Sequence, residues 1–229
     1  MKLRFLSIFP IIALFAVAAK FDEHTKRIEA SATVLSEIMA AGDHSIPRDL
    51  LEKAECVGIV PSLKRAGFIV GGKYGKGVLT CRVDGGNGWS AVSTIRIEGG
   101  SIGLQIGAGE TDVIFIVMND SGMKNLMRDK FTIGGDASAM AGPVGRSVEA
   151  QTDLMMRAEI LSYSRAHGVF AGVSLDGATL RPDNDDNRKV YNSSATQEEI
   201  LTGKVERPVS AEKLYRELNT YAPYKKASN

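Results

Sequence analysis

The sequence has little of several residue types, and each scarcity excludes a class of protein. Its 229 residues include only two cysteines, three histidines and one tryptophan. Two cysteines exclude a scaffold held by several disulfides, and three scattered histidines argue against a zinc site. Lysine plus arginine (28) nearly equals aspartate plus glutamate (27). The chain is therefore not a polyanion binder of the histone type, and we expect no nucleic-acid partner.

Proline is also scarce, at seven residues, whereas glycine is abundant, at 24. Because no Gly-x-y period accompanies them, the glycines do not indicate collagen; they predict strand ends, bulges and tight turns. Apolar residues make up 44% of the chain and charged residues 24%. This balance is typical of a globular protein.

The chain has one long apolar run, at its N-terminus. Lys2 and Arg4 precede the run, Phe5–Val17 forms it, and Ala18-Ala19 completes a small-residue cleavage site. At about 15 residues the run is short for a transmembrane span, and no cysteine follows it for lipid attachment. We expect residues 1–19 to be a cleaved signal peptide and 20–229 a single domain, exported to the periplasm or outside the cell, peripheral to a membrane. The alternative is an uncleaved anchor.

Export changes the interpretation of the two cysteines. Cys56 begins the apolar run 56–60, and Cys81 lies in the apolar run 78–83. Both look like strand positions, and an oxidising compartment permits a disulfide between them. Two separate buried thiols are the alternative, which the sequence leaves open.

Two periodicities predict the fold class. Residues 23–41 read as an amphipathic helix, because Ile28, Ala32, Leu35 and Met39 share one face. A second short helix capped by Ser45 and a last helix capped by Ser210 are also expected. Between them, short β-branched runs alternate with glycines over 56–60, 67–71, 77–83, 89–97, 101–106 and 111–118. The prediction is an α+β fold whose glycine-rich, mainly antiparallel sheet curls toward a barrel between N- and C-terminal helices.

Three short motifs resemble functional signatures and fail in detail. The stretch 67–73 has P-loop spacing, but Tyr74 stands where magnesium coordination needs Ser or Thr, and strand-like residues surround it. The acids from Asp183 onward resemble a calcium loop, but Arg188 occupies the position that requires glycine. Ser174 lacks the following glycine of a nucleophile elbow. We therefore expect no nucleotide, metal, cofactor or catalytic residue, and no enzyme.

One charge feature points to a binding surface. No acid occurs between Glu55 and Asp84. The span holds five bases: Lys64, Arg65, Lys73, Lys76 and Arg82. If 56–83 is a three-stranded meander, the first four lie at its turns. Such a local positive patch on a nearly neutral chain suits phosphate head groups; ordinary solvated turn charge is the alternative.

Several stretches together resemble the SYLF domain family. They are Ile46-Pro47, 54–61, 66–72, 75–78, 88–90, 101–108, 141–146, 162–164, 168–177, Asn187 and Tyr191. The resemblance covers about 28–220 and implies a non-enzymatic lipid-binding domain. Eukaryotic members bind phosphoinositides through an N-terminal amphipathic helix and basic residues, and some regulate actin; bacterial members are exported or are lipoproteins.

The resemblance and the residues together give the functional prediction. The amphipathic helix would present Lys26 and Arg27 to lipid, and Arg146 after Gly142-Pro143 offers a fork-shaped phosphate donor, or else holds an internal carboxylate. The uncharged stretch 99–109 pairs as a strand or bends over an acyl chain. We expect binding of anionic phospholipid or a similar amphiphile at an envelope membrane. Actin is not expected in this compartment. The alternative is a structural or interaction protein of the envelope without a lipid ligand.

Overall fold

The computed structural model describes residues 22–42, 45–68, 70–83, 88–102, 107–144, 158–166 and 169–223. The expected signal peptide and Arg146 lie outside these residues, so both stay predictions. No helix in the described ranges is long and apolar enough to cross a membrane.

Helices stand at both ends of the chain and strands fill its middle, as the periodicities predict. The helices are α1 (Glu23–Met39), α2 (Arg48–Lys53), α3 (Asp120–Leu126), α5 (Asn184–Tyr191), α6 (Gln197–Leu201) and α7 (Glu212–Tyr221), with the 3-10 turn η3 (Val209–Ala211). The strands are β1 (Cys56–Phe68), β2 (Val70–Cys81), β3 (Ser93–Ile102), β4 (Gly107–Val117), β5 (Phe131–Thr132), β6 (Ala139–Ala141), β7 (Ile160–Ala166), β8 (Val169–Gly172) and β9 (Thr179–Pro182).

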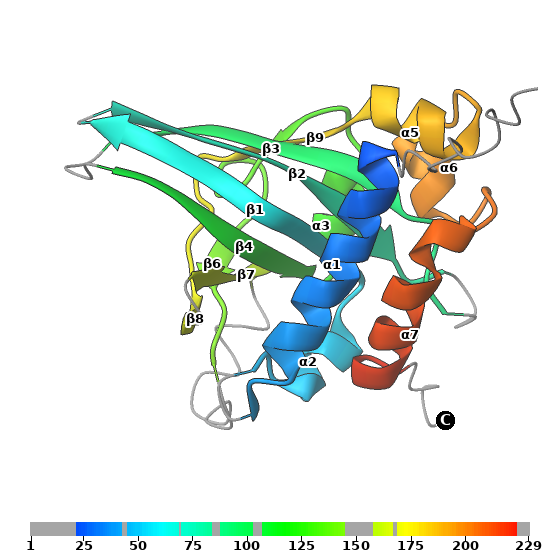
Figure 1. Ribbon diagram of the computed structural model, residues 1–229, viewed down its shortest axis with the longest axis horizontal. Coiled ribbons are helices and arrows are strands. Elements are labelled where there is room, and N and C mark those ends of the chain that lie inside the picture. Colours follow the sequence, from blue (N-terminus) through cyan, green and yellow to red (C-terminus); the bar gives the residue numbers. More distant parts are fainter. Residues whose placement is uncertain are drawn as a thin grey trace, which may run out of the picture.

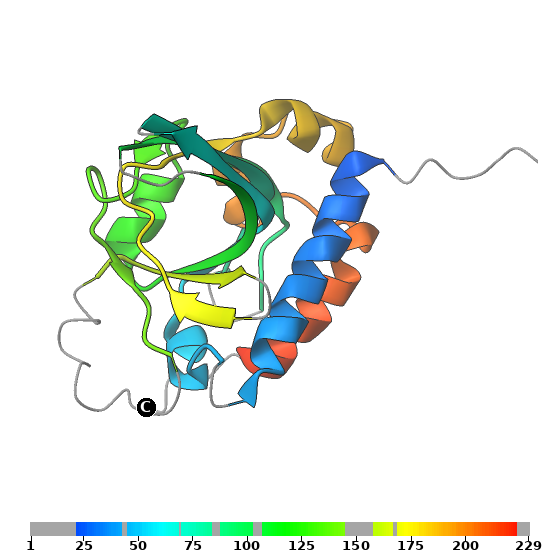
Figure 2. The same cartoon turned by 60° about the vertical axis from the view of Figure 1, so that its left-hand side comes forward.

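The strands form one curled sheet in the order β5-β9-β3-β2-β1-β4-β7-β6, with β8 paired to β7. All pairs of these strands are antiparallel except β6 with β7. Figure 2 shows the curl end-on, as a half-barrel with α1 and α7 on one side. The predicted fold class is confirmed: an α+β domain with a mainly antiparallel, barrel-like sheet flanked by N- and C-terminal helices.

The sheet buries apolar side chains on both faces. Alternate residues of the central strands, such as Val113 and Phe115, point into the concave side, where α3 and α6 complete a first core. Their neighbours Ile114 and Ile116 point to the convex side and pack with the terminal helices in a second core. Burial on both faces explains why 113–118 is apolar without alternation.

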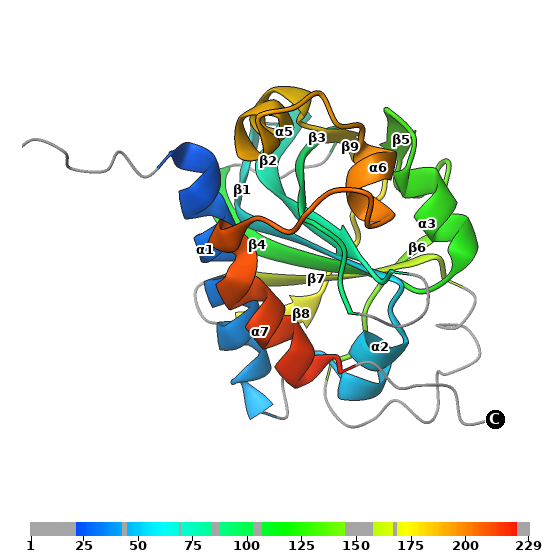
Figure 3. The same ribbon diagram turned by 90° about the vertical axis from the view of Figure 1, so that its right-hand side faces the viewer.

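The predicted N-terminal helix is confirmed as α1, and its apolar stripe is buried against the rest of the domain. Ile28, Ala32 and Leu35 are fully buried. They belong to the convex core together with Leu214 and Leu218 of α7, and Figures 1 and 3 show α1 and α7 side by side over the sheet. The stripe that predicted the helix is therefore a packing surface.

The expected three-stranded meander over 56–83 is wrong. The segment is one long antiparallel hairpin, β1 with β2, whose register runs from Cys56↔Cys81 to Phe68↔Val70. Pro61-Ser62, which resembles a turn, is a bulge within β1. Ser62 has a positive φ of 50° and donates its N–H to Asp112 Oδ1 at 3.0 Å. Because the bulge adds residues, Val60 and Leu63 both reach the concave core.

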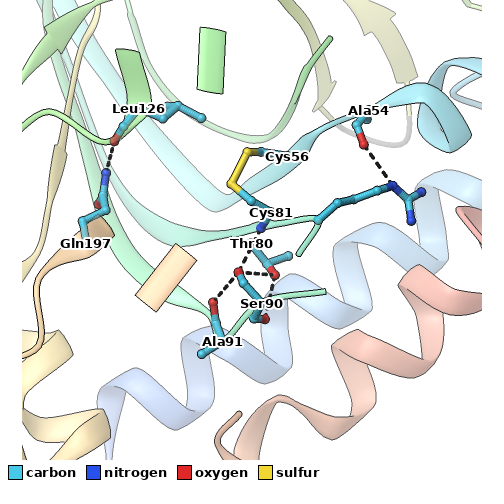
Figure 4. Close-up of a disulfide and its surroundings, with 9 residues drawn as sticks. Ala54, Cys56, Thr80, Cys81, Ser90, Ala91, Leu126 and Gln197 are labelled. Carbon is cyan, nitrogen blue, oxygen red and sulfur yellow. Dashed lines mark hydrogen bonds between the residues drawn. A yellow bond between two sulfur atoms is a disulfide. The ribbon is translucent and has the colours of Figure 1, made fainter. Parts of the chain in front are cut away.

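The base of this hairpin is closed covalently. Cys56 and Cys81 are register partners and form a disulfide (Figure 4). Beside it, Thr80 donates to the Ser90 carbonyl at 2.9 Å, and Arg82 Nε donates to the Ala54 carbonyl at 3.2 Å. The disulfide and these bonds hold the end of the sheet nearest α2.

The expected helix caps differ in detail. Ser45 does not cap α2, which starts after Pro47 without a side-chain bond. Ser210 lies within η3 and does not cap α7. The side chain of Asn119 caps α3 by accepting the N–H of Gly122.

Candidate functional site

Four strand ends project from the body of the domain: those of the β1–β2 hairpin and, on either side of it, those of β3 next to β2 and of β4 next to β1. We call residues 64–74 of the β1–β2 hairpin the first arm and residues 98–110, which include the ends of β3 and β4, the second arm. The arms pair with each other, because Tyr74 faces Glu98 and Lys64 faces Glu110. Figure 1 shows the free ends of β1 to β4 extending away from α1 and α7. The arms carry three of the predicted lipid-binding bases: Lys64, Arg65 and Lys73.

Arg65 and Lys73 are direct cross-strand partners on the concave face of the arms. The row of four register partners at this level is Gly109, Arg65, Lys73 and Gly99. The next row toward the tips is Gly107, Gly67, Gly71 and Ser101. Two adjacent cations are thus flanked by glycines on the same face, and almost no side chain stands between them and the tips.

The Arg65–Lys73 pair lacks acidic partners. Like charges directly opposite each other on a sheet destabilise it. In the described part of the chain neither cation has a carboxylate within salt-bridge distance, and Arg65 Nε is buried without a hydrogen-bond partner. Lys73 Nζ donates to the backbone carbonyl of Asp176 at 3.2 Å. Burial and the nearby Arg65 lower the pKa of Lys73. An anion between the two cations would relieve this strain.

Lys64 lies on the opposite, convex face of the same strand. Its side chain is 71% exposed, and its ammonium is 3.8 Å from the carboxylate of Glu110, its register partner on β4. A loose, exposed pair of this kind contributes little to stability. Lys64 therefore remains available to an anionic surface, but it does not share a site with Arg65.

Lys76 and Arg27, also expected to contact lipid, are engaged within the fold. Lys76 Nζ lies 2.6 Å from Asp183 Oδ2 and 3.2 Å from Asp186 Oδ2, and Arg27 reaches the same Asp186 oxygen at 2.7 Å. The hydrogen bond to Asp183 raises the pKa of Lys76. Burial alone would raise the pKa of Asp186, but the hydrogen bonds from Arg27 and Lys76 lower it to about 2. This network ties α1 and β2 to α5.

Lys26 lies in a separate groove between α1 and α7. The groove has a volume of about 600 Å³. Its lining is polar, with the bases Lys26, Lys213 and Arg216 and the acids Glu29 and Glu212. Lys213 Nζ donates to Thr33 Oγ1 at 2.9 Å across it. The predicted basic residues therefore divide among the arms, the buried network and this groove.

No catalytic or metal-binding arrangement is found among the described residues. Ser174 Oγ donates to Asp176 Oδ2 at 2.5 Å and accepts from the Asp176 N–H at 3.1 Å, so it stabilises a loop. The described ranges contain no group of three or more His, Cys, Asp or Glu residues placed to hold a metal ion.

Comparison with known proteins places the chain in a family. Residues 98–221 match the model of the Ysc84 family, described as "Las17-binding protein actin regulator". This match spans more than half of the chain and includes the second arm, β9 and the C-terminal helix α7. The chain belongs to the SYLF (Ysc84) family.

Its relatives are named as binding or regulatory proteins, not as enzymes. LAS seventeen-binding protein 3 of Saccharomyces cerevisiae is 35% identical over 89% of this chain and 44% of its own length. An SH3 domain-containing protein of Schizosaccharomyces pombe is 38% identical over 76% of this chain and 41% of its own. The human SH3 domain-containing YSC84-like protein 1 is 34% identical over 78% of this chain and 52% of its own length. This SYLF chain thus spans about half the length of the relatives it matches.

Sequence reasoning found the basic residues but missed their pairing. The pairing of Arg65 with Lys73 depends on where the hairpin turns, and the expected turns at Lys64-Arg65 and at Lys73/Lys76 hide it. One signal was available in the second arm, because Gly99, Gly107 and Gly109 stand at odd positions on either side of its tip. In a strand, that spacing puts Gly107 and Gly109 on one face; the place of Gly99 beside them depends on how the strands pair.

Proposed function

We propose that this SYLF protein is a non-enzymatic protein that binds anionic phospholipid at an envelope membrane through its two arms. Export and a periplasmic or extracellular location are part of the proposal, since they come from residues 1–19. The observation that carries it is the set of three bases, Lys64, Arg65 and Lys73, on the projecting end of the β1–β2 hairpin, the first arm, which has no acid.

The energetics favour these three bases over the others. A base near an anionic membrane surface contributes about 1 kcal/mol. Lys76 and Arg27 are already neutralised by Asp183 and Asp186, so using them at a membrane would break buried ion pairs. Arg65 and Lys73 have no such partner in the described structure, so an anion relieves their repulsion and breaks no ion pair.

Vesicle binding tests the proposal. The variant Lys64→Gln/Arg65→Gln/Lys73→Gln loses three charges, about 3 kcal/mol at the surface, so its affinity for phosphatidylglycerol vesicles should fall on the order of 100-fold. The matched control removes three bases from the α1–α7 groove: Lys26→Gln/Lys213→Gln/Arg216→Gln. It should bind like the wild type. Co-sedimentation at low and moderate salt measures both, with circular dichroism to verify folding.

A second candidate function is protein binding without a lipid ligand. The groove between α1 and α7 favours it, since its five charged residues have no salt bridge in the described structure. The family is described by Las17 binding and actin regulation, and one yeast relative is a LAS seventeen-binding protein. If the arm variant binds vesicles as well as the wild type does, the lipid proposal fails and this candidate takes its place.

A further inference from the structure

The arms have a composition that surface adhesion alone does not require. Adhesion to a membrane needs exposed bases, as Lys64 is, but Arg65 and Lys73 face inward on the concave side of the sheet. Arg65 Nε is buried without a partner among the described residues. A buried, unsatisfied charged donor is costly, so a group that accepts its hydrogen bond is expected.

The space beside this donor is open. A Cβ atom added at Gly109, the register partner of Arg65 on β4, would have no heavy atom within 4 Å. On the other side, a Cβ atom at Gly99 would lie 2.8 Å from Lys73 Cε, so the lysine side chain lies over that glycine. Open space therefore adjoins Arg65 on the β4 side, while Lys73 closes the β3 side.

The next row toward the tips consists mainly of glycine. Its register partners are Gly107, Gly67, Gly71 and Ser101, so three of the four positions carry no side chain. In the other direction the concave face is filled, because Leu63 and Ile97 are fully buried. A ligand whose head lies at Arg65 and Lys73 can therefore extend only toward the tips. The distance from Arg65 to Phe68 is about 10 Å at strand spacing.

We infer that the concave face of the arms binds one anionic, single-chain amphiphile, with its phosphate or other oxyanion on Arg65 and Lys73 and its alkyl chain over the glycine row. This inference rests on the proposed function and deepens it, because it adds a site for one molecule to the membrane-surface contact. Arg65 supplies a planar fork of N–H donors and Lys73 an ammonium, which together match a tetrahedral oxyanion.

Octyl phosphate is a suitable probe, because its chain is short enough for the arm and it dissolves as a monomer. Titration calorimetry with the folded protein should show one molecule bound. Replacing Arg65 by Gln should weaken binding about 10-fold, since a charge-assisted hydrogen bond is lost. The matched control Lys64→Gln removes the adjacent charge on the convex face and should change the affinity less than about 2-fold.

A second matched pair tests the open space beside the two cations. Gly109→Val fills the open space on the concave face, and Gly72→Val fills equally open space on the convex face, where a Cβ atom also has nothing within 4 Å. Neither glycine has a positive φ, so both variants should fold, and thermal unfolding verifies this. Only Gly109→Val should weaken octyl phosphate binding, by about 10-fold or more.

Each remaining outcome overturns the inference in a distinct way. Inorganic phosphate binding as tightly as octyl phosphate would mean a site for a free anion, without a chain. If the uncharged octyl glucoside binds as tightly as octyl phosphate, the two cations do not bind the head group. If the two valine variants weaken binding equally, the ligand does not lie on the concave face. If octyl phosphate does not bind while phosphatidylglycerol vesicles still do, the inference fails and the proposed function stands; loss of both refutes both.

Discussion

Replacing Asp186 by Asn should destabilise the domain through loss of the network that joins α1, β2 and α5. The carboxylate is 9% exposed and contacts both Arg27 and Lys76. Its pKa is lowered from 3.8 to about 2. Each pKa unit corresponds to 1.36 kcal/mol, so the ionised carboxylate stabilises the fold by at most about 2 kcal/mol at neutral pH, since solvent screens part of the interaction. In this variant Lys76 keeps its salt bridge with Asp183, which prevents a larger loss of stability.

The pH dependence has a defined sign. A carboxyl group whose pKa is lower in the folded state stabilises the fold fully above its unfolded pKa, and the contribution disappears as the pH falls through the folded value. The pKa of Asp186 is 3.8 in the unfolded chain and about 2 in the fold. Its contribution to stability is therefore complete above about pH 5. About half of it remains at pH 3.

Urea unfolding followed by circular dichroism measures the effect, with Asp185→Asn as the matched control. Asp185 is the neighbouring acid, 75% exposed, and pairs with Arg188 on the surface of α5. Its loss should cost less than about 1 kcal/mol. Equal destabilisation by the two variants, or a deficit of Asp186→Asn that is as large at pH 3 as at pH 7, would refute the argument that Arg27 and Lys76 are structural.

Three further variants test the packing, each by urea unfolding. Trp89 is 2% exposed, so Trp89→Ala should cost about 3–5 kcal/mol; an unchanged midpoint would contradict its burial. A Cβ atom at Gly58 would lie 2.0 Å from the Phe115 ring, so Gly58→Ala should cost about 1–3 kcal/mol and Phe115→Leu should recover part of it. No recovery would mean that the ring is not the obstacle. The double variant Cys56→Ala/Cys81→Ala opens a 25-residue loop and should lose about 3.5 kcal/mol; wild-type stability would contradict this.

The sequence predicted those parts of the fold that depend on local periodicity. Helix α1 was predicted because Ile28, Ala32 and Leu35 recur at helical spacing. The long hairpin was divided wrongly because Lys64-Arg65 and Lys73/Lys76 were expected at turns, whereas they lie within two long paired strands, the first of which has a bulge at Pro61-Ser62. Bulges depend on tertiary context, so residue types alone do not distinguish them from turns.

The same limit applied to the candidate site. Charge patterning identified the acid-free span, but not which bases already have partners. Lys76 meets Asp186 across 110 residues of sequence, and Arg27 meets it across 159. Contacts at such separation depend on the topology of the sheet and helices. The structure therefore divides one sequence cluster into structural bases and bases available for binding.

Hydrogen–deuterium exchange with and without phosphatidylglycerol vesicles tests the central proposal most directly, because it locates the contact surface. We expect the vesicles to slow exchange in peptides from the first and second arms, 64–74 and 98–110, and to leave α1 and α7 unchanged. Neutral phosphatidylcholine vesicles should protect neither region. Protection confined to Glu23–Met39 and Glu212–Tyr221, with none in the arms, would contradict the proposal.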